Sequence, residues 1–99
     1  MVEVTIAAGT ATVVISGELD TLALPLLSSR FAQVIDARPG RLVINLAGVG
    51  FMDCATARLI TGMDRCLPRG QRVVIRSASP PVRRLLEVSG LAARCEIEE

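Results

Sequence analysis

The chain has 99 residues, which is enough for one domain with its own core but not for two. Hydrophobic residues make up 51% of it, yet it has only two Phe and no Trp or Tyr, so the core must be aliphatic. The formal net charge is +1, and aromatic stacking platforms are missing, which argues against a nucleic-acid-binding protein.

The chain also lacks the side chains that many enzymes and metal sites use. It contains no His, which removes Ser-His and Cys-His catalytic pairs and the commonest metal ligand. The cysteines Cys54, Cys66 and Cys95 are odd in number and have no CxxC spacing, so neither a disulfide framework nor a zinc site is expected. We therefore expect no cofactor and no metal, and a reduced cytoplasmic setting.

The beginning of the sequence and its apolar runs predict neither secretion nor membrane insertion. A signal peptide requires a basic region before an apolar segment, and the first ten residues contain no such region. No apolar run approaches the ~20 residues of a membrane span.

The first two predicted elements form a hairpin. Residues 2–7 (VEVTIA) alternate, with β-branched residues on one face, and residues 11–16 (ATVVIS) form a second strand after the turn signal Gly9-Thr10. A connection of about three residues makes the pair antiparallel. Gly17 is expected to end the second strand.

A helix is predicted next. Asp20 or Thr21 can cap it, and Pro25 belongs in a first helical turn, so the helix starts near 22–25. Pro39-Gly40 ends the segment. The apolar face of this helix consists of Leu24, Leu27, Phe31, Val34 and Ile35.

Strands and helices then alternate along the rest of the chain. Residues 41–49 contain a continuous apolar run, which predicts a strand buried on both faces. A helix over about 54–67, a strand over 71–77 and a helix over 80–89 follow, and ARCEIEE (93–99) supplies a short final strand. The expected inward residues are Leu59, Ile60, Met63 and Leu67 of the second helix and Val82, Leu85 and Leu86 of the third.

The order β-β-α-β-α-β-α-β predicts the fold class. Strands that alternate with helices need crossover connections, and these give a largely parallel sheet. We therefore predict a single small α/β domain over residues 1–99, with a mixed, mostly parallel sheet of about five strands and three main helices. Ser79 and Gly90 are expected at the two ends of the third helix.

The junction at residues 50–58 is the strongest candidate site. In an open parallel sheet, ligands and partners bind at the loops that follow the strands' C-terminal ends. A helix N-terminus at such a loop adds free N–H groups and a positive dipole end, which suit an anion or a phosphoryl group. Asp53 either orients a neighbouring hydroxyl or simply caps the helix.

Three stretches of the sequence resemble one known family in their order and spacing. They are SGELD (16–20), LVINLAGVGFMDCATARLI (42–60) and SPPVRRLLEVSGL (79–91). The first resembles the family segment G-E-[LI]-D, the second a buried strand followed by F-[MLI]-D-S-S-G-L, and the third a closing helix with a G-L end. The sequence thereby resembles the STAS domain of the bacterial anti-sigma factor antagonists (anti-anti-sigma factors) over nearly its whole length.

This resemblance implies a non-enzymatic module of signal transduction and transcription regulation. Members of the family bind an anti-sigma factor that is also a Ser/Thr switch kinase, and the unphosphorylated form thereby causes release of the sigma factor. The kinase phosphorylates a Ser just after the motif Asp, which adds about −1.5 to −2 charges at the docking surface. A phosphatase resets the switch.

The sequence departs from the family motif at the phosphorylated position. Asp53 matches the motif Asp, Cys54 falls on the acceptor Ser, Ala55 on the second Ser and Thr56 on the Gly. A thiol is not a normal substrate of a Ser/Thr kinase. Thr56 is the nearest hydroxyl, but two residues along a helix rotate it by roughly 200° from Cys54. The resemblance thus implies that Cys54 is not phosphorylated and leaves Thr56 as the candidate acceptor.

Cys54 has two further interpretations. A Cys at a helix N-terminus can form a reactive thiolate, which would suit a thiol-based sensor. Asp53 opposes this because a nearby negative charge favours the neutral thiol, and Cys54 is then a small stand-in for Ser. Cys66 lies about 18 Å further along the same predicted helix, too far for a disulfide, and Cys95 is expected in the core.

The predicted partner surface combines the starts of the first two helices. Arg58 and Arg65 are seven residues apart and share a helix face, which is either an ordinary solvated face or a docking surface for an acidic patch. Glu18 and Asp20 can add to the same rim, but nothing else in the chain completes a catalytic carboxylate pair. The predicted partner-binding residues are Glu18, Asp20, Thr21, Asp53, Cys54, Ala55, Thr56, Arg58, Thr61 and Arg65.

The stretch SASPPVRR (77–84) is a weaker candidate site. Arg83 and Arg84 lie near a predicted helix N-terminus, where they either help bind an anion or are simply solvated.

We therefore expect a binding module whose partner is an anti-sigma factor of the switch-kinase type, acting as a monomer or weak dimer. Nucleic acid and direct membrane insertion are not expected. The alternatives are a peripheral STAS subunit of a transporter/ATPase complex and a thiol-based sensor. An enzyme is the weakest interpretation, because there is no His, no metal set and no glycine-rich phosphate loop.

Overall fold

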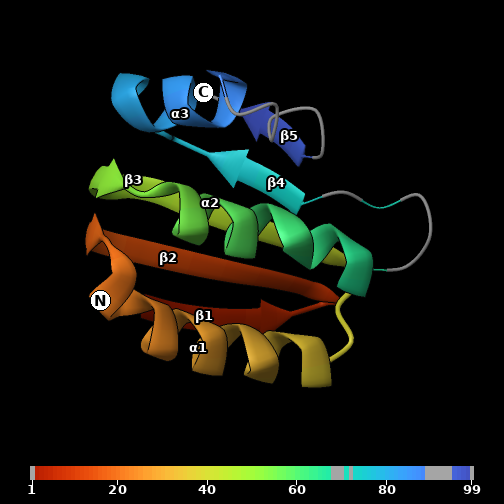
Figure 1. The fold of residues 1–99 in the computed structure, drawn as a ribbon. Helices are drawn as coiled ribbons and strands as arrows, with labels where there is room; N and C mark the ends of the chain where they lie inside the picture. Colours follow the sequence, from red (N-terminus) through yellow and green to blue (C-terminus); the bar gives the residue numbers. More distant parts are fainter. Residues whose placement is uncertain (1, 68–70, 72, 89–94, 99) are drawn as a thin grey trace.

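The computed structural model describes residues 2–67, 71, 73–88 and 95–98. The five strands are β1 (Val2–Ala7), β2 (Thr10–Leu19), β3 (Arg41–Met52), β4 (Val73–Arg76) and β5 (Cys95–Glu98). The helices are α1 (Leu24–Asp36), α2 (Cys54–Thr61) and α3 (Pro80–Val88), with short 3-10 helices η1 (Thr21–Ala23) and η2 (Gly62–Cys66). The predicted fold class and element order are confirmed (Figure 1).

The strands form one mixed sheet in the order β1-β2-β3-β4-β5. β1 and β2 pair antiparallel as the predicted hairpin, and every other neighbouring pair is parallel. The hairpin loop is shorter than predicted. Only Ala8 and Gly9 lie between the strands, and both have positive φ values, 52° and 80°. Such a two-residue loop matches the twist of the strands that it joins.

Strand β2 continues past Gly17, so the prediction that this glycine ends the strand is wrong. Gly17 has a φ of 101°, and the register of β2 against β3 shifts between Val14 and Ser16 and again between Gly17 and Glu18. The positive φ of Gly17 thus accommodates a register shift inside the strand, and glycine often occupies such positions in a sheet.

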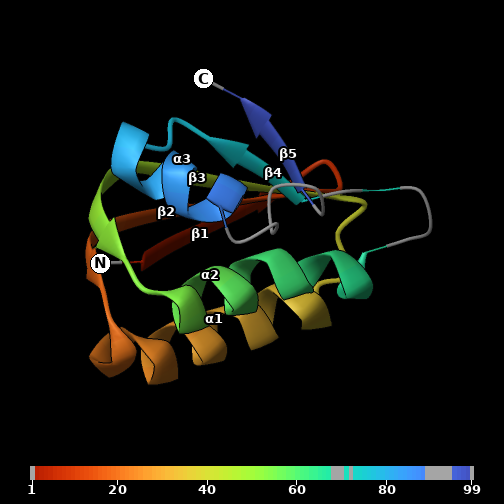
Figure 2. The ribbon, with the colours of Figure 1, turned by 45° about the horizontal axis from the view of Figure 1, so that its top comes forward.

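All three helices pack on the same face of the sheet (Figure 2). The cross-strand row Val13, Ile44, Ile75 and Ile97 points to this face and joins the same core cluster as Phe31 of α1, Ile60 of α2 and Leu86 of α3. The strand order explains the arrangement. Each helical crossover leads to the next strand in the same direction, and right-handed crossovers then place every helix on one side.

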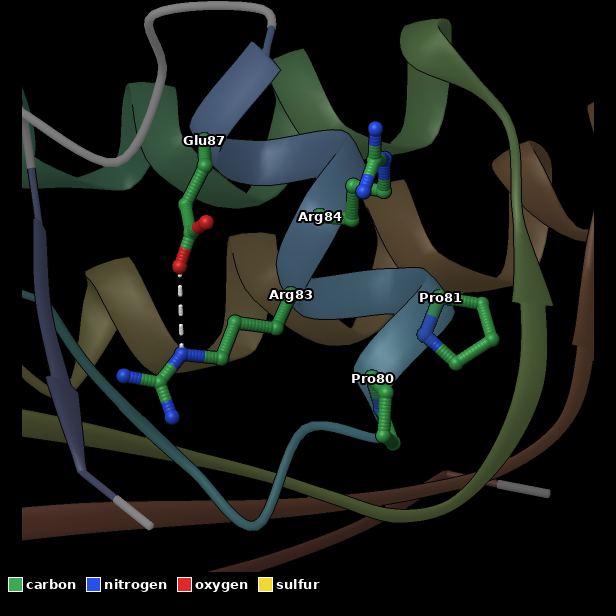
Figure 3. Close-up of a pocket in the computed structure, with 5 residues that line it drawn as sticks. All are labelled: Pro80, Pro81, Arg83, Arg84 and Glu87. Carbon is green, nitrogen blue, oxygen red and sulfur yellow. Dashed lines mark hydrogen bonds and ion pairs between the residues drawn. The ribbon is translucent and has the colours of Figure 1, made fainter.

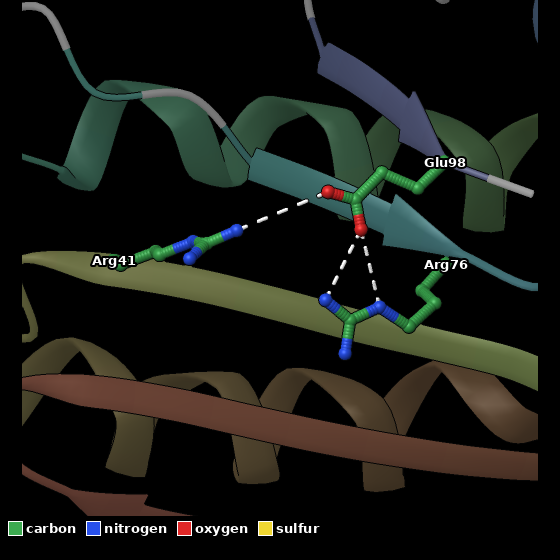
Figure 4. Close-up of polar contacts among 3 residues, drawn as sticks. All are labelled: Arg41, Arg76 and Glu98. Atoms are coloured by element: carbon green, nitrogen blue, oxygen red, sulfur yellow. Dashed lines mark hydrogen bonds and ion pairs between the residues drawn. The ribbon is translucent and has the colours of Figure 1, made fainter.

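The other face of the sheet carries a bridge of charged side chains (Figure 4). Glu98 of β5 accepts from Arg76 of β4 at 3.1 Å and lies 3.9 Å from Arg41 of β3, so the second ion pair passes across β4. Val43 and Val74 belong to this face and are nevertheless only 4% and 3% exposed. The prediction of a strand over 41–49 buried on both faces therefore holds only for residues 42–44, because Asn45 is partly exposed and Ala47 and Gly48 are exposed.

The helix boundaries depart from the predictions in detail. The α-helical part of the second helix ends at Thr61 and continues as the tighter η2, whereas a single helix over 54–67 was predicted. The predicted inward residues Ile60 and Met63 are buried. In α1, Leu27, Phe31 and Val34 are buried as predicted, but Ile35 is 39% exposed. The third helix ends at Val88, and Gly90 lies outside the described residues.

Candidate functional site: the strand-end surface

Asp53 closes strand β3 and caps helix α2. Its backbone is extended (φ −88°, ψ 170°), and its Oδ1 accepts a hydrogen bond of 2.8 Å from the backbone N–H of Thr56. The backbone N–H of Asp53 donates to the carbonyl oxygen of Leu19 at 2.9 Å. Asp53 therefore acts as an N-cap and also connects the end of β3 to the end of β2.

Thr56 points into the molecule. Its side chain is 0% exposed, and its hydroxyl donates to the carbonyl oxygen of Leu19 at 3.4 Å. The carbonyl of Leu19 thus accepts hydrogen bonds from both Asp53 and Thr56. The folded first turn of α2 therefore shields this hydroxyl from solvent.

Asp20 organises the start of the neighbouring segment. Its Oδ1 accepts from the backbone N–H of Leu22 at 3.0 Å, and its carbonyl accepts from the N–H of Ala23 at 3.0 Å. The side chain therefore caps η1. The N-cap residue of α1 is Ala23, which makes no side-chain cap hydrogen bond, so the prediction that Asp20 or Thr21 caps the α-helix itself is wrong.

Several predicted partner-binding residues are accessible on this side of the molecule. Cys54 and Ala55 are exposed in the first turn of α2, and Glu18 is exposed where β2 pairs with Phe51 of β3. Arg58 and Arg65 are also exposed, further along α2 and η2. The side chains of Thr21 and Thr61 lie outside the described part of the chain.

Exposed apolar side chains at the same end of the sheet were missed in the sequence. Leu22 is 88% exposed, Phe51 50% and Leu26 48%. The sequence carries a signal for two of the three: Leu26 falls opposite the predicted core face of α1, and Phe51 alternates with the buried Met52. We use the name strand-end surface for Glu18, Leu22, Phe51, Cys54 and Ala55.

Arg83 and Arg84 lie along the outer side of α3, where they line a shallow pocket with Pro80, Pro81 and Glu87 (Figure 3). Arg83 forms an ion pair of 3.2 Å with Glu87 one helical turn later. Ser79, expected to cap α3, donates through its hydroxyl to the carbonyl of Val49 at 3.4 Å and so joins α3 to β3. The pairing of Arg83 favours the interpretation that these arginines form an ordinary solvated helix face.

The described residues contain neither a metal-binding cluster nor a membrane-spanning helix. No three His, Cys, Asp or Glu side chains among them gather closely enough to hold a metal ion. None of the helices in that part of the chain combines the length and the apolar character needed to cross a bilayer.

Helices cover one side of the mixed sheet, and helix α2, capped by Asp53, directly follows the central strand β3. The model of the family described as "Mlab, STAS domain" matches residues 2–97, so the chain belongs to this family. No curated protein matches the chain.

Solved structures agree with this assignment. An anti-sigma factor antagonist from Mycobacterium paratuberculosis is 27% identical, with a TM-score of 0.84 over 98% of this chain and 83% of its own. SpoIIAA of Bacillus in its unphosphorylated form is 22% identical (TM-score 0.82, 100% and 89% covered). A putative antagonist from Thermotoga maritima is 16% identical (TM-score 0.86, 99% and 86% covered). The predicted resemblance to STAS-type anti-sigma factor antagonists is confirmed.

Proposed function

We propose that this chain is a cytoplasmic regulatory module that binds an anti-sigma factor of the switch-kinase type through its strand-end surface. The observation that carries the proposal is the exposure of Leu22 and Phe51 beside the capped start of α2. Covering a large apolar side chain that is 88% exposed lowers the free energy of the complex, because its apolar surface is removed from water. The similarity to an anti-sigma factor antagonist supports the kind of partner.

We further propose that the usual phosphorylation switch does not operate at this surface. The residue at the motif's acceptor position is Cys54, which is exposed but carries a thiol. Thr56, the neighbouring hydroxyl, is fully buried and hydrogen-bonded to Leu19. SpoIIAA, by contrast, has been solved in both unphosphorylated and phosphorylated forms. Binding by this chain would then be controlled by its abundance or by the partner.

Affinity capture from the native cell tests this proposal. Wild-type chain, Leu22→Ser and Arg58→Glu are used as bait, and the bound proteins are identified by mass spectrometry. We expect capture of an anti-sigma factor by the wild type and a reduction of roughly tenfold or more with Leu22→Ser, because a buried apolar anchor contributes at least about 1.4 kcal/mol. Arg58→Glu should weaken capture if the partner presents an acidic patch.

Val88→Ser is the matched control, because Val88 is an aliphatic residue of α3 that is 76% exposed. Equal capture by Leu22→Ser and the wild type would contradict the proposed surface. Capture of a transport ATPase instead of an anti-sigma factor would favour the alternative of a peripheral transporter subunit.

A further inference from the structure

The strand-end surface is made from two separate parts of the chain. Glu18 and Leu22 flank the end of β2, whereas Phe51, Cys54 and Ala55 flank the start of α2. The carbonyl of Leu19 is the point at which the two parts meet, because it accepts the N–H of Asp53 at 2.9 Å and the hydroxyl of Thr56 at 3.4 Å.

The hydrogen bonds on either side of this carbonyl extend the connection into both parts. Asp20, the next residue after Leu19, holds the N–H of Leu22 at 3.0 Å. Asp53 holds the N–H of Thr56 at 2.8 Å and so fixes the turn that presents Cys54 and Ala55. A short series of hydrogen bonds therefore runs from Leu22 to the first turn of α2.

Thr56 is the member of this series whose side chain lies inside the molecule. It is completely buried and directs its hydroxyl at the carbonyl oxygen of Leu19. The hydroxyl adds a second bond between the end of β2 and α2, next to the backbone bond that Asp53 makes.

We propose that Thr56 is a positioning residue, whose buried hydroxyl holds the two parts of the strand-end surface in the relative position that the partner requires. This inference rests on the proposed function. Only molecules with both parts in place bind, so loss of the hydroxyl lowers the apparent affinity by the fraction of molecules in which the parts separate. One hydrogen bond limits that loss to at most about tenfold.

The test compares Thr56→Val with Thr56→Ser. Valine keeps the shape but removes the hydroxyl, and serine restores the hydroxyl. The first measurement is amide hydrogen exchange of the free protein. We expect the Leu22 amide to exchange faster in Thr56→Val, by a larger factor than the Ile75 amide of β4, whose exchange follows global unfolding, and at the wild-type rate in Thr56→Ser. Leu22 has no hydrogen bond to Thr56, so a purely local effect on α2 would not alter its exchange.

The second measurement is a calorimetric titration with the purified protein that wild-type chain captures. We expect a measurable loss of affinity, of at most about tenfold, for Thr56→Val and wild-type affinity for Thr56→Ser. Wild-type exchange at Leu22 together with wild-type affinity in Thr56→Val would overturn the inference. If wild-type chain captures no protein, the proposed function fails, and the exchange of Leu22 still decides whether the hydroxyl couples the two parts.

Discussion

Gly48 lies where two neighbouring strands, β2 and β3, approach each other closely. A Cβ atom at this position would lie 2.7 Å from the Cβ of Ser16 and 3.3 Å from its Cα, distances that require the backbone to move. Ser16 and Gly48 are paired directly after one of the register shifts between β2 and β3. The absence of a side chain at Gly48 is therefore what permits this irregular pairing next to the strand-end surface.

Gly48→Ala is expected to lower the free energy of unfolding by about 1–3 kcal/mol, the usual cost of forcing an extra carbon into a close contact. Urea denaturation followed by circular dichroism measures it. Gly50→Ala is the matched control on the same strand, since a Cβ there meets nothing within 4 Å. Equal stability of the two variants would show that the close approach imposes no constraint.

Residues at the candidate site were predictable only where their local sequence determines their role. Asp53 could be recognised as an N-cap because it directly precedes a helical pattern. Leu22 could not be placed in the same way, because its exposure depends on η1, a turn that Asp20 creates and that the periodicity of α1 does not reveal. The partner of the Thr56 hydroxyl is 37 residues away in the sequence, so only the folded chain identifies it.

At the scale of elements, α2 depends on its cap. It has only eight residues, and helices this short are not stable in isolation. The hydrogen bond from Thr56 N–H to Asp53 Oδ1 satisfies one of the N–H groups that every helix start leaves unpaired.

Asp53→Ala should therefore destabilise the protein by about 1 kcal/mol, whereas Asp53→Asn should cost only a few tenths, because asparagine caps nearly as well as aspartate. Thermal unfolding of the two variants measures the difference. An equal loss in both would mean that the negative charge of Asp53, and not its capping hydrogen bond, stabilises this end of α2.

Element boundaries were less predictable than the elements themselves. The alternation in β1 and the apolar face of α1 are local patterns, and both elements lie where these patterns place them. β2 runs on to Leu19 because its later residues pair with Gly48–Met52 of β3, which its own sequence does not reveal. The change from α2 to η2 at Gly62 likewise gives no clear signal in the apolar periodicity.

At the scale of the whole molecule, the two cysteines with described side chains report on opposite environments. Cys54 is exposed at the strand-end surface, whereas Cys95 is 4% exposed at the start of β5 and belongs to the core, as predicted. Iodoacetamide should therefore modify Cys54 in the native protein and Cys95 only after unfolding, which mass spectrometry of the digested protein can resolve.

The rate of this modification also distinguishes the roles of Cys54. We expect Cys54 to react with iodoacetamide no faster than free cysteine at neutral pH, because a cysteine that merely replaces the motif Ser has no activated thiol. Much faster, selective reaction would instead favour a thiol-based sensor. Modification of Cys95 at the same rate as Cys54 would contradict the burial of β5.

The sequence could predict the sheet, the helices and their order, but it did not reveal whether the helices cover one face of the sheet or both. The apolar run of β3 indicated burial on both sides, which a two-sided helical arrangement would also explain. The sequential strand order, which places all helices together, becomes visible only from the strand pairing.

The bridge formed by Arg41, Arg76 and Glu98 also affects what the uncovered face can bind. These side chains are between 36% and 50% exposed, so water still solvates their charges. A flat apolar partner laid on this face would have to remove that water from three charges and would recover little in exchange. A partner on this face would also gain little from Val43 and Val74, which are already buried, whereas the strand ends carry the exposed apolar side chains Leu22 and Phe51.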